Sequence, residues 1–372
     1  MIPYRRYFLS LAVSCSIASS TVIARPLASL DDNAIIEKLP QTITLMKNKN
    51  HPLRQQLQQQ PKDINTAIAL AKQYIEIGQS QSDPRFLGYA QGLLSPWWTL
   101  KEPPISVRLL RATIYQNQHR FQEAMADLNY IVTTAPNNQH ALLLKATLHQ
   151  SMGQHRQAIG SCYKLAKSAP AVISSGCMAA SLFASGLAKP ALHLLQSLSE
   201  ETITQQTPTT QQWIYTLFAE ISAHLKQAEA EPLFYKALTI KKRSPYLLLT
   251  YTDYLLQQQQ AKKVIELLEK DEVLDDTLLL QLARAYRALG NIKQTEKYQE
   301  ILSRRFKVLT LQNTPLHKAA AARFALEFEG NQQKALSLAE ANWQSQKTYR
   351  DKQILKDALV AINTPKNITL IK

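Results

Sequence analysis

The chain has 372 residues, a formal net charge of +15 at pH 7 and only 9 glycines. Apolar residues make up 45% of it, enough to bury a hydrophobic core, which excludes a wholly disordered chain. The scarcity of glycine disfavours an all-β sandwich or barrel, which needs frequent tight turns, and a glycine-rich nucleotide site, so we expect no cofactor.

Residues 1–24 have the pattern of a secretory signal peptide. Arg5 and Arg6 precede a stretch of apolar and small residues, and Val22–Ala24 offers a small-residue cleavage site. We therefore expect an exported protein that is periplasmic or secreted.

Two other roles for this N-terminus remain open. A transmembrane anchor is one, although the apolar stretch is marginal for a span of about 20 residues. The other is a lipoprotein signal, because Ala12–Cys15 resembles a bacterial lipobox. Cys15 would then carry a lipid anchor, and the protein would be an outer-membrane lipoprotein.

A 34-residue repeat follows in the middle of the chain. Each of its first two units, 105–136 and 139–170, has two amphipathic stretches and ends on a proline, which terminates a helix. Three positions recur at a spacing of 34 residues, namely Ala112 with Ala146, Ala124 with Ala158, and Pro136 with Pro170. Small residues at such positions let two helices pack closely where they cross.

This pattern resembles the tetratricopeptide repeat (TPR), a helix–turn–helix unit of the same length. Degraded copies extend it over 63–346. The resemblance implies an all-α fold, a right-handed α-solenoid of about seven to eight TPR-like repeats. It also implies a protein-binding role for the concave face, which the first helix of each repeat lines.

The rest of the chain is arranged around this solenoid. We predict short connections between helices at Thr202–Thr210 and Gln257–Gln260, and an amphipathic last helix at Asp351–Ile362 that closes the solenoid's end. The predicted domains are a signal peptide (1–24), a partly irregular N-terminal segment (25–62) with a short helix at Asn33–Leu39, the solenoid (63–346), a C-terminal capping helix (347–364) and a tail (365–372).

Repeated polar side chains make up the candidate partner-binding groove. Thr113 and Thr147, like Gln116 and Gln150, occupy equivalent positions on the first helices of adjacent repeats. Such uncharged groups suit the backbone of an extended peptide, although ordinary solvated residues would give the same pattern. The full set of candidates is Thr113, Gln116, Asn117, Thr147, Gln150, Ser151, Arg284 and Arg287.

Two further pairs of residues stand out. Trp97 and Trp98 either cover the start of the solenoid, one of them buried, or form an aromatic platform for a peptide or sugar. Cys162 and Cys177 are the only cysteines after the signal, and they flank a predicted turn between antiparallel helices. An oxidising compartment would favour a disulfide between them, with two buried free thiols as the alternative.

Residues that could carry catalysis or bind a metal are scattered. His140, His149 and His155 fall within one repeat, but their spacing puts them on different faces or helices. The acidic cluster at 271–276 reads as a solvated connection in which Asp275 or Asp276 caps the next helix. We therefore predict no catalytic residue and no metal site.

These features together predict a non-catalytic scaffold or adaptor of the cell envelope that binds an envelope protein or an extended peptide segment. A glycan-processing or other envelope enzyme built on helical repeats is the alternative, and it would need paired carboxylates in a cleft. The basic residues form no stripe interleaved with aromatics, so we expect no nucleic-acid partner. Apart from an anchor at Cys15, only weak attraction to an anionic surface would bring the chain to a membrane.

Overall fold

The computed structural model describes residues 52–240, 244–270, 274–311 and 317–363, which form twenty helices and no strand. The chain divides into two compact units, Met1–Asn48 and Lys49–Lys372, and all the described helices belong to the second. The predicted signal peptide, the predicted helix at Asn33–Leu39 and the tail at 365–372 lie outside the described residues. Within the described part, no helix is both long and apolar enough to cross a membrane.

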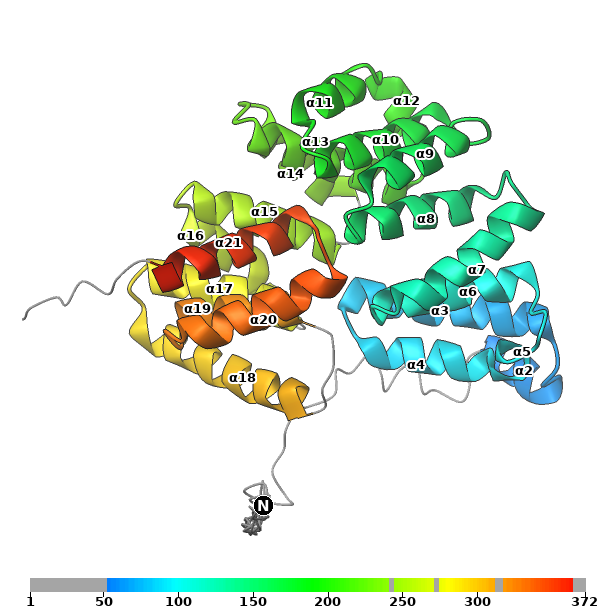
Figure 1. Ribbon diagram of the computed structural model, residues 1–372, viewed down its shortest axis with the longest axis horizontal. Coiled ribbons are helices and arrows are strands. Elements are labelled where there is room, and N and C mark those ends of the chain that lie inside the picture. The colour runs from blue at the N-terminus through cyan, green and yellow to red at the C-terminus, as the bar shows by residue number, and fades with distance from the viewer. Residues whose placement is uncertain (1–51, 241–243, 271–273, 312–316, 364–372) are drawn as a thin grey trace, which may run out of the picture. The chain divides into compact units, whose positions relative to one another are not determined.

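Eight antiparallel helix pairs make up most of this unit (Figure 1). In chain order they are α3 (Ile64–Gln81) with α4 (Pro84–Leu93), α6 (Ile105–Asn117) with α7 (Phe121–Thr134), α8 (Gln139–Ser151) with α9 (His155–Leu165), α10 (Ala171–Ala184) with α11 (Ala188–Gln196), α13 (Pro208–His224) with α14 (Ala230–Ile240), α15 (Pro245–Gln257) with α16 (Ala261–Leu268), α17 (Asp276–Ala288) with α18 (Ile292–Leu311), and α19 (Lys318–Glu327) with α20 (Gln332–Ser345). The remaining helices are α2 (Pro52–Gln59), α5 (Ser95–Trp98), α12 (Glu200–Thr204) and α21 (Tyr349–Asn363). The predicted α-solenoid of TPR-like repeats is confirmed.

The turn inside a pair is built in the same way in successive repeats. His119 and Gly153, 34 positions apart, both have positive φ, at 58° and 71°. The next residue in each turn donates its N–H back to a carbonyl of the first helix, from Arg120 to Tyr115 and from Gln154 to His149, at 2.8 and 2.7 Å. This left-handed residue ends the first helix of the pair and reverses the chain direction.

Small residues lie where the helices cross, as the repeat predicts. Ala112, Ala124, Ala146 and Ala158 are all fully buried. The tightest approach is at Gly176 of α10, where an added Cβ would lie 2.5 Å from Ile214 Cδ1. A side chain at that position would force the side chains of Ile214 and Trp213 to shift.

A disulfide joins two successive repeats. Cys162 of α9 and Cys177 of α10 are bonded, with their Cα atoms 5.5 Å apart, a separation ordinary for a disulfide. Both side chains are buried in a cluster with Leu142, Ala146 and Leu165. The antiparallel packing of α9 on α10 brings them to the same height and lets both face inward.

The structure corrects one predicted connection. Thr202–Thr210 contains most of α12 and the start of α13. Two hydroxyl caps lie in close succession, since Ser199 Oγ accepts the N–H of Thr202 at 3.2 Å and Thr207 Oγ1 accepts that of Thr210 at 3.3 Å. The predicted turn at Gln257–Gln260 is confirmed, and Gln259 is its left-handed residue.

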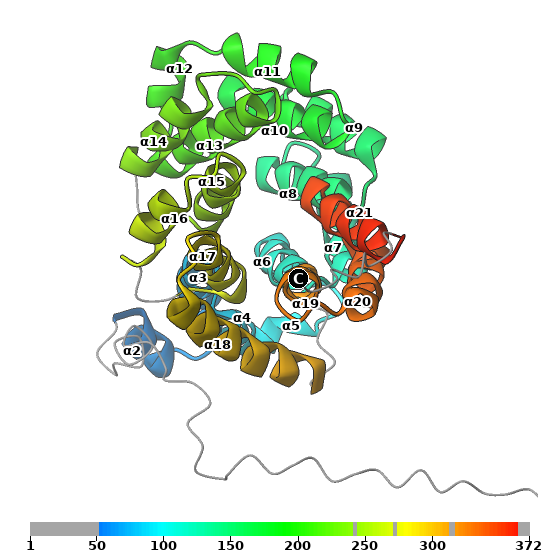
Figure 2. The same cartoon turned by 90° about the vertical axis from the view of Figure 1, so that its left-hand side faces the viewer.

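The helix pairs follow one another around a common inner side (Figure 2). The first helices of the pairs lie inside and the second helices outside, and α15 contacts α3 of the first repeat. The last helix, α21, packs Ile354 and Ala358 onto Ala335 and Ala339 of α20, as a capping helix would. It begins at Tyr349, two residues before the predicted start at Asp351.

Candidate functional site

The candidate groove residues belong to α6, α8 and α17. These are three of the six helices (α6, α8, α10, α13, α15 and α17) whose inward surface we define as the inner face. Its hydroxyl and amide groups largely bond within their own helices. Thr113 Oγ1 donates to the carbonyl of Leu109 at 2.9 Å, and Asn117 Nδ2 donates to that of Thr113 at 2.8 Å. Thr147 Oγ1 likewise donates to Leu143 at 3.1 Å. These helices therefore satisfy their own polar groups, as Thr and Asn side chains commonly do.

One further candidate residue connects neighbouring helices. Gln150 Nε2 of α8 donates to the buried hydroxyl of Ser181 on α10 at 2.8 Å. Gln116 is half-buried on α6. Whether any of these residues binds a partner stays a prediction.

A segment of the chain itself lies on the inner face. Residues 346–348 connect α20 to α21, and we call them, together with Tyr349 and Arg350 of the first turn of α21, the cis segment. The N–H of Lys347 donates to the carbonyl of Ser151, at the end of α8, at 2.7 Å. The approach is close, because a Cβ on Gly153 would lie 3.2 Å from the Cβ of Lys347. Backbone pairing thus begins at α8, almost 200 residues earlier in the chain.

The aromatic residue of the cis segment reaches the next two inner helices. The ring of Tyr349 stands edge-on to His224 of α13, with centroids 5.3 Å apart, and lies 6.3 Å from Phe183 of α10. Phe183 and His224 are themselves in edge contact at 5.2 Å. Together they form an aromatic corner between two repeats.

The guanidinium of Arg350 binds one repeat further along. Its Nε donates to Asp253 Oδ2 of α15 at 2.7 Å, and its Nη2 donates to Thr250 Oγ1 at 3.0 Å. Glu220 Oε1 of α13 lies 4.0 Å from the same Nη2. Burial opposes the charge on Arg350, but Asp253 and Glu220 outweigh it and raise the pKa of the guanidinium. The two acids therefore form a cation site.

A half-buried tyrosine holds one of these acids in place. The hydroxyl of Tyr246, on the first turn of α15, donates to Glu220 Oε2. Burial raises the pKa of Tyr246 well above its ordinary value, and the charge of Glu220 adds to this. Tyr246 therefore stays a hydrogen-bond donor and orients the carboxylate of Glu220 at any physiological pH.

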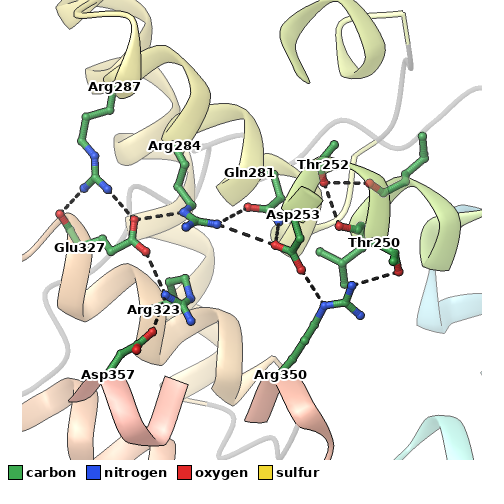
Figure 3. Close-up of polar contacts among 12 residues, drawn as sticks. Thr250, Thr252, Asp253, Gln281, Arg284, Arg287, Arg323, Glu327, Arg350 and Asp357 are labelled. Atoms are coloured by element: carbon green, nitrogen blue, oxygen red, sulfur yellow. Dashed lines mark hydrogen bonds and ion pairs between the residues drawn. The ribbon is translucent and has the colours of Figure 1, made fainter. Parts of the chain in front are cut away.

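The polar contacts continue from Asp253 along the inner face (Figure 3). Asp253 accepts from Gln281, and Gln281 Oε1 accepts from Arg284 Nη1 at 2.7 Å. Arg284 and Arg287 of α17, both candidate groove residues, then bind Glu327 of α19, at 3.1 and 2.5 Å. These two arginines do face the inner side, where they form ion pairs with Glu327 of the C-terminal helix α19.

The carboxylate of Glu327 also pairs with a third arginine, Arg323, on its own helix. Arg323 Nη1 lies 3.2 Å from Glu327 Oε1 and 3.1 Å from Asp357 Oδ2 of α21. Burial raises the pKa of Glu327, but the surrounding arginines outweigh it, and the pKa is lowered overall. Acids and arginines alternate through this whole network, so their charges compensate one another.

A buried capping box fixes the start of α21. The N–H of Thr348 donates to Asp351 Oδ2 at 2.8 Å, and the N–H of Asp351 donates to Thr348 Oγ1 at 3.3 Å. Asn342 Nδ2 of α20 donates to the other oxygen of Asp351 at 2.7 Å. This Thr-x-x-Asp pattern is the one local signal in the sequence that places the cis segment, and our sequence reasoning missed it.

Trp97 and Trp98 form the short helix α5 at the start of the solenoid. Both are half-buried, so the expected burial of one of them was wrong. Trp98 stands edge-on to Tyr115 of α6, with centroids 5.4 Å apart, and Arg111 lies 5.8 Å from its ring centre. Trp98 thus covers the next repeat, while the aromatic platform stays a prediction.

His149 and Asp275 have structural roles. His149 Nδ1 pairs with Gln154 Oε1 at 2.6 Å, inside the turn of its repeat. Asp275 caps α17 by accepting the N–H of Leu278 at 2.9 Å, which confirms the predicted cap. Residues 271–273 lie outside the described part. Within that part, no group of three His, Cys, Asp or Glu side chains could hold a metal ion.

Comparison with known proteins adds information on the fold alone. No family model and no curated protein matches the chain. Among solved structures, Pseudomonas aeruginosa PilF is 16% identical with a TM-score of 0.41, covering 55% of this chain and 92% of that one. A tetratricopeptide repeat protein from Parabacteroides merdae is 14% identical with a TM-score of 0.33, covering 79% and 98%. The human IFIT1 dimer with m7Gppp-AAAA is 14% identical with a TM-score of 0.47, covering 83% and 76%.

The repeated pairs, their shared turns and the inner face define the fold as a TPR-like α-solenoid.

Proposed function

We propose that this protein is a non-catalytic scaffold of the cell envelope that captures extended peptide segments on its inner face. One observation carries the proposal: four successive inner helices already hold a short stretch of the same chain, made of the connection 346–348 and the first turn of α21. The cis segment is bound at Ser151 through its backbone, and at Phe183, His224 and Asp253 through its side chains.

The same kinds of contact are used when proteins bind extended peptides. Main-chain hydrogen bonds supply affinity, and separate pockets for individual side chains supply specificity. Aromatic residues and arginine are the side chains that most often dominate the energy of an interface. The cis segment presents one of each in succession, at Tyr349 and Arg350.

The chemistry of the inner face favours binding over glycan hydrolysis. Glycosidases need a pair of carboxyl groups across a cleft, one to donate a proton and one to act as base or nucleophile. Glu220, Asp253 and Glu327 each face an arginine instead. The charge of each carboxylate is compensated by an arginine, which suits a structural role better than proton transfer or nucleophilic attack.

The proposed location in the envelope rests on residues 1–24. Their pattern of two arginines, an apolar stretch and small residues before Arg25 is that of a cleaved export signal. The Cys162–Cys177 disulfide agrees with an oxidising compartment such as the periplasm. Partners would then be other envelope proteins.

Photo-crosslinking in intact cells tests the proposal. A photoreactive amino acid at Gln116, on the inner helix α6, is expected to capture a segment of an envelope protein, found in the periplasmic or membrane fraction. The matched control is the same amino acid at Tyr163 on the outer helix α9, where the side chain is 64% exposed. Adducts from Tyr163 alone, or adducts only with cytoplasmic proteins, would contradict the proposal.

A further inference from the structure

The cis segment divides the inner face into three neighbouring subsites, each with its own chemistry. The carbonyl of Ser151 takes a backbone N–H, and the corner of Phe183 and His224 takes an aromatic ring. The third, between α13 and α15, takes a guanidinium through Glu220 and Asp253. They follow the chain direction of the segment, so a ligand must present these groups in the same order.

The third subsite is specific because of its charge. Two carboxylates lie near one guanidinium, with Asp253 Oδ2 at 2.7 Å and Glu220 Oε1 at 4.0 Å. Thr250 Oγ1 adds a third acceptor at 3.0 Å from Arg350 Nη2, which suits a planar group with several N–H donors. A lysine offers one point charge and cannot reproduce this arrangement.

The cis segment is placed where it can be displaced. Tyr349 is 47% exposed as a residue, and the side chain of Arg350 is 33% exposed. The apolar anchoring of α21 lies further along, at Ile354 and Ala358, against α20. Release of residues 346–350 breaks the Thr348–Asp351 capping box and unwinds the first turn of α21, while the contacts of Ile354 and Ala358 keep the rest of that helix docked.

From these contacts we propose that the surface formed by Ser151, Phe183, Glu220, His224 and Asp253 is a binding site for a partner segment in which an aromatic residue is followed by arginine. Tyr349–Arg350 is the cis occupant that such a segment displaces. This inference rests on the proposed function and names the ligand class of the same inner face.

Competition by the cis segment sets the expected affinity. A tethered ligand acts at an effective concentration on the order of millimolar, so a peptide in trans binds the intact chain weakly. Releasing the tethered ligand raises the fraction of binding-competent protein, and the apparent affinity rises by the same factor.

The test uses the full chain and a fluorescent nine-residue peptide that copies residues 344–352. The double variant Tyr349→Ser/Arg350→Glu releases the cis segment, because it places a third carboxylate against Glu220 and Asp253. We expect this variant to bind the peptide at least tenfold more tightly than the unmodified chain. Adding Asp253→Asn should remove most of that gain. The control is Lys352→Glu, which makes the same change of charge as Arg350→Glu but at an exposed position of α21. This control variant should bind the peptide as the unmodified chain does.

Two results would overturn the proposal. One is a released variant, folded by circular dichroism, that binds no more tightly than the unmodified chain. The other is equal binding of a peptide with alanine in place of its tyrosine and arginine. If the released variant does not fold, hydrogen exchange in the unmodified chain decides. The peptide at millimolar concentration must accelerate hydrogen exchange across 346–352, and the alanine peptide must not. If neither peptide accelerates exchange, the proposal is overturned.

Failure of this inference leaves the proposed function separately testable. Crosslinks from Gln116 with no binding of the tyrosine–arginine peptide would mean that the inner face captures partners of another chemistry. If Gln116 gives no crosslinks and the tyrosine–arginine peptide does not bind, the proposed function is contradicted as well.

Discussion

Replacing Asp127 by alanine is expected to lower the free energy of unfolding by about 3 kcal/mol, near the lower end of what breaking a buried ion pair costs. Asp127 of α7 is 3% exposed. It accepts two hydrogen bonds from Arg111, at 2.7 and 2.6 Å, and a third from Arg108 at 3.1 Å. One carboxylate thus compensates two guanidiniums of the neighbouring helix.

The arginines left behind determine the size of this effect. Their side chains are only 11% and 14% exposed, so neither charge recovers full hydration when Asp127 is lost. Some compensation remains, because Arg108 stacks on Tyr130 at 3.8 Å and donates to the carbonyl of Pro103. These contacts keep the loss at about 3 kcal/mol rather than at the upper end of the range.

Urea unfolding of the variant and the unmodified chain measures this difference. The control is Glu123→Ala on the same helix, whose carboxylate pairs with Arg120 at the surface, both side chains being 46% exposed. Exposed pairs of this spacing contribute about 0.5 kcal/mol or less. Equal losses for Asp127→Ala and Glu123→Ala would show that the two-arginine pair adds nothing beyond a surface contact.

Replacing Glu327 by glutamine is expected to destabilise the chain by about 2 kcal/mol at pH 7 and by much less at pH 3. At neutral pH its carboxylate compensates Arg284, Arg287 and Arg323, and its side chain is only 15% exposed. Glutamine keeps part of the hydrogen bonding but not the charge, so the cost falls below that of complete removal.

The pH dependence follows from the direction of the shift. The pKa of Glu327 is lowered in the folded chain relative to about 4.3 in an unfolded one. Its contribution is therefore fully present above the unfolded value and is lost as pH falls through the folded value. The glutamine variant has no such group, so its difference from the unmodified chain must shrink in acid.

Unfolding at pH 7 and pH 3 tests this expectation, with the variant compared to the unmodified chain at each pH. Glu329→Gln is the control, because its exposed carboxylate pairs only locally with Lys334, at 2.7 Å. A difference for Glu327→Gln that is the same at both pH values would rule out the carboxylate's charge as its source.

The 34-residue repeat was enough to predict the helix pairs, because small crossing residues and turns recur in register. Ala112, Ala146 and Gly153 lie where that register puts them. The connection at Thr202–Thr210 was mistaken for a loop, since its many threonines show no apolar period. The hydroxyl caps of Ser199 and Thr207, which start two helices there, are local signals that do not depend on such a period.

The repeat also places Arg284 and Arg287 on the inner face, yet it gives no information about what they touch there. Their partner Glu327 lies about 40 residues away, and Arg350 lies 97 residues from Asp253. Contacts between residues so far apart in the sequence depend on the curvature accumulated over several repeats. A repeat pattern describes only neighbouring units, so the cis segment was not predictable from it.

A double-mutant cycle between Asp253 and Arg350 tests most directly whether the inner face holds the cis segment. Unfolding free energies are measured for Asp253→Ala, Arg350→Ala, the double variant and the unmodified chain. We predict a coupling of about 1 kcal/mol, modest because both side chains keep roughly 30% exposure. Additive effects, with a coupling indistinguishable from zero, would contradict the binding of Arg350 at Asp253.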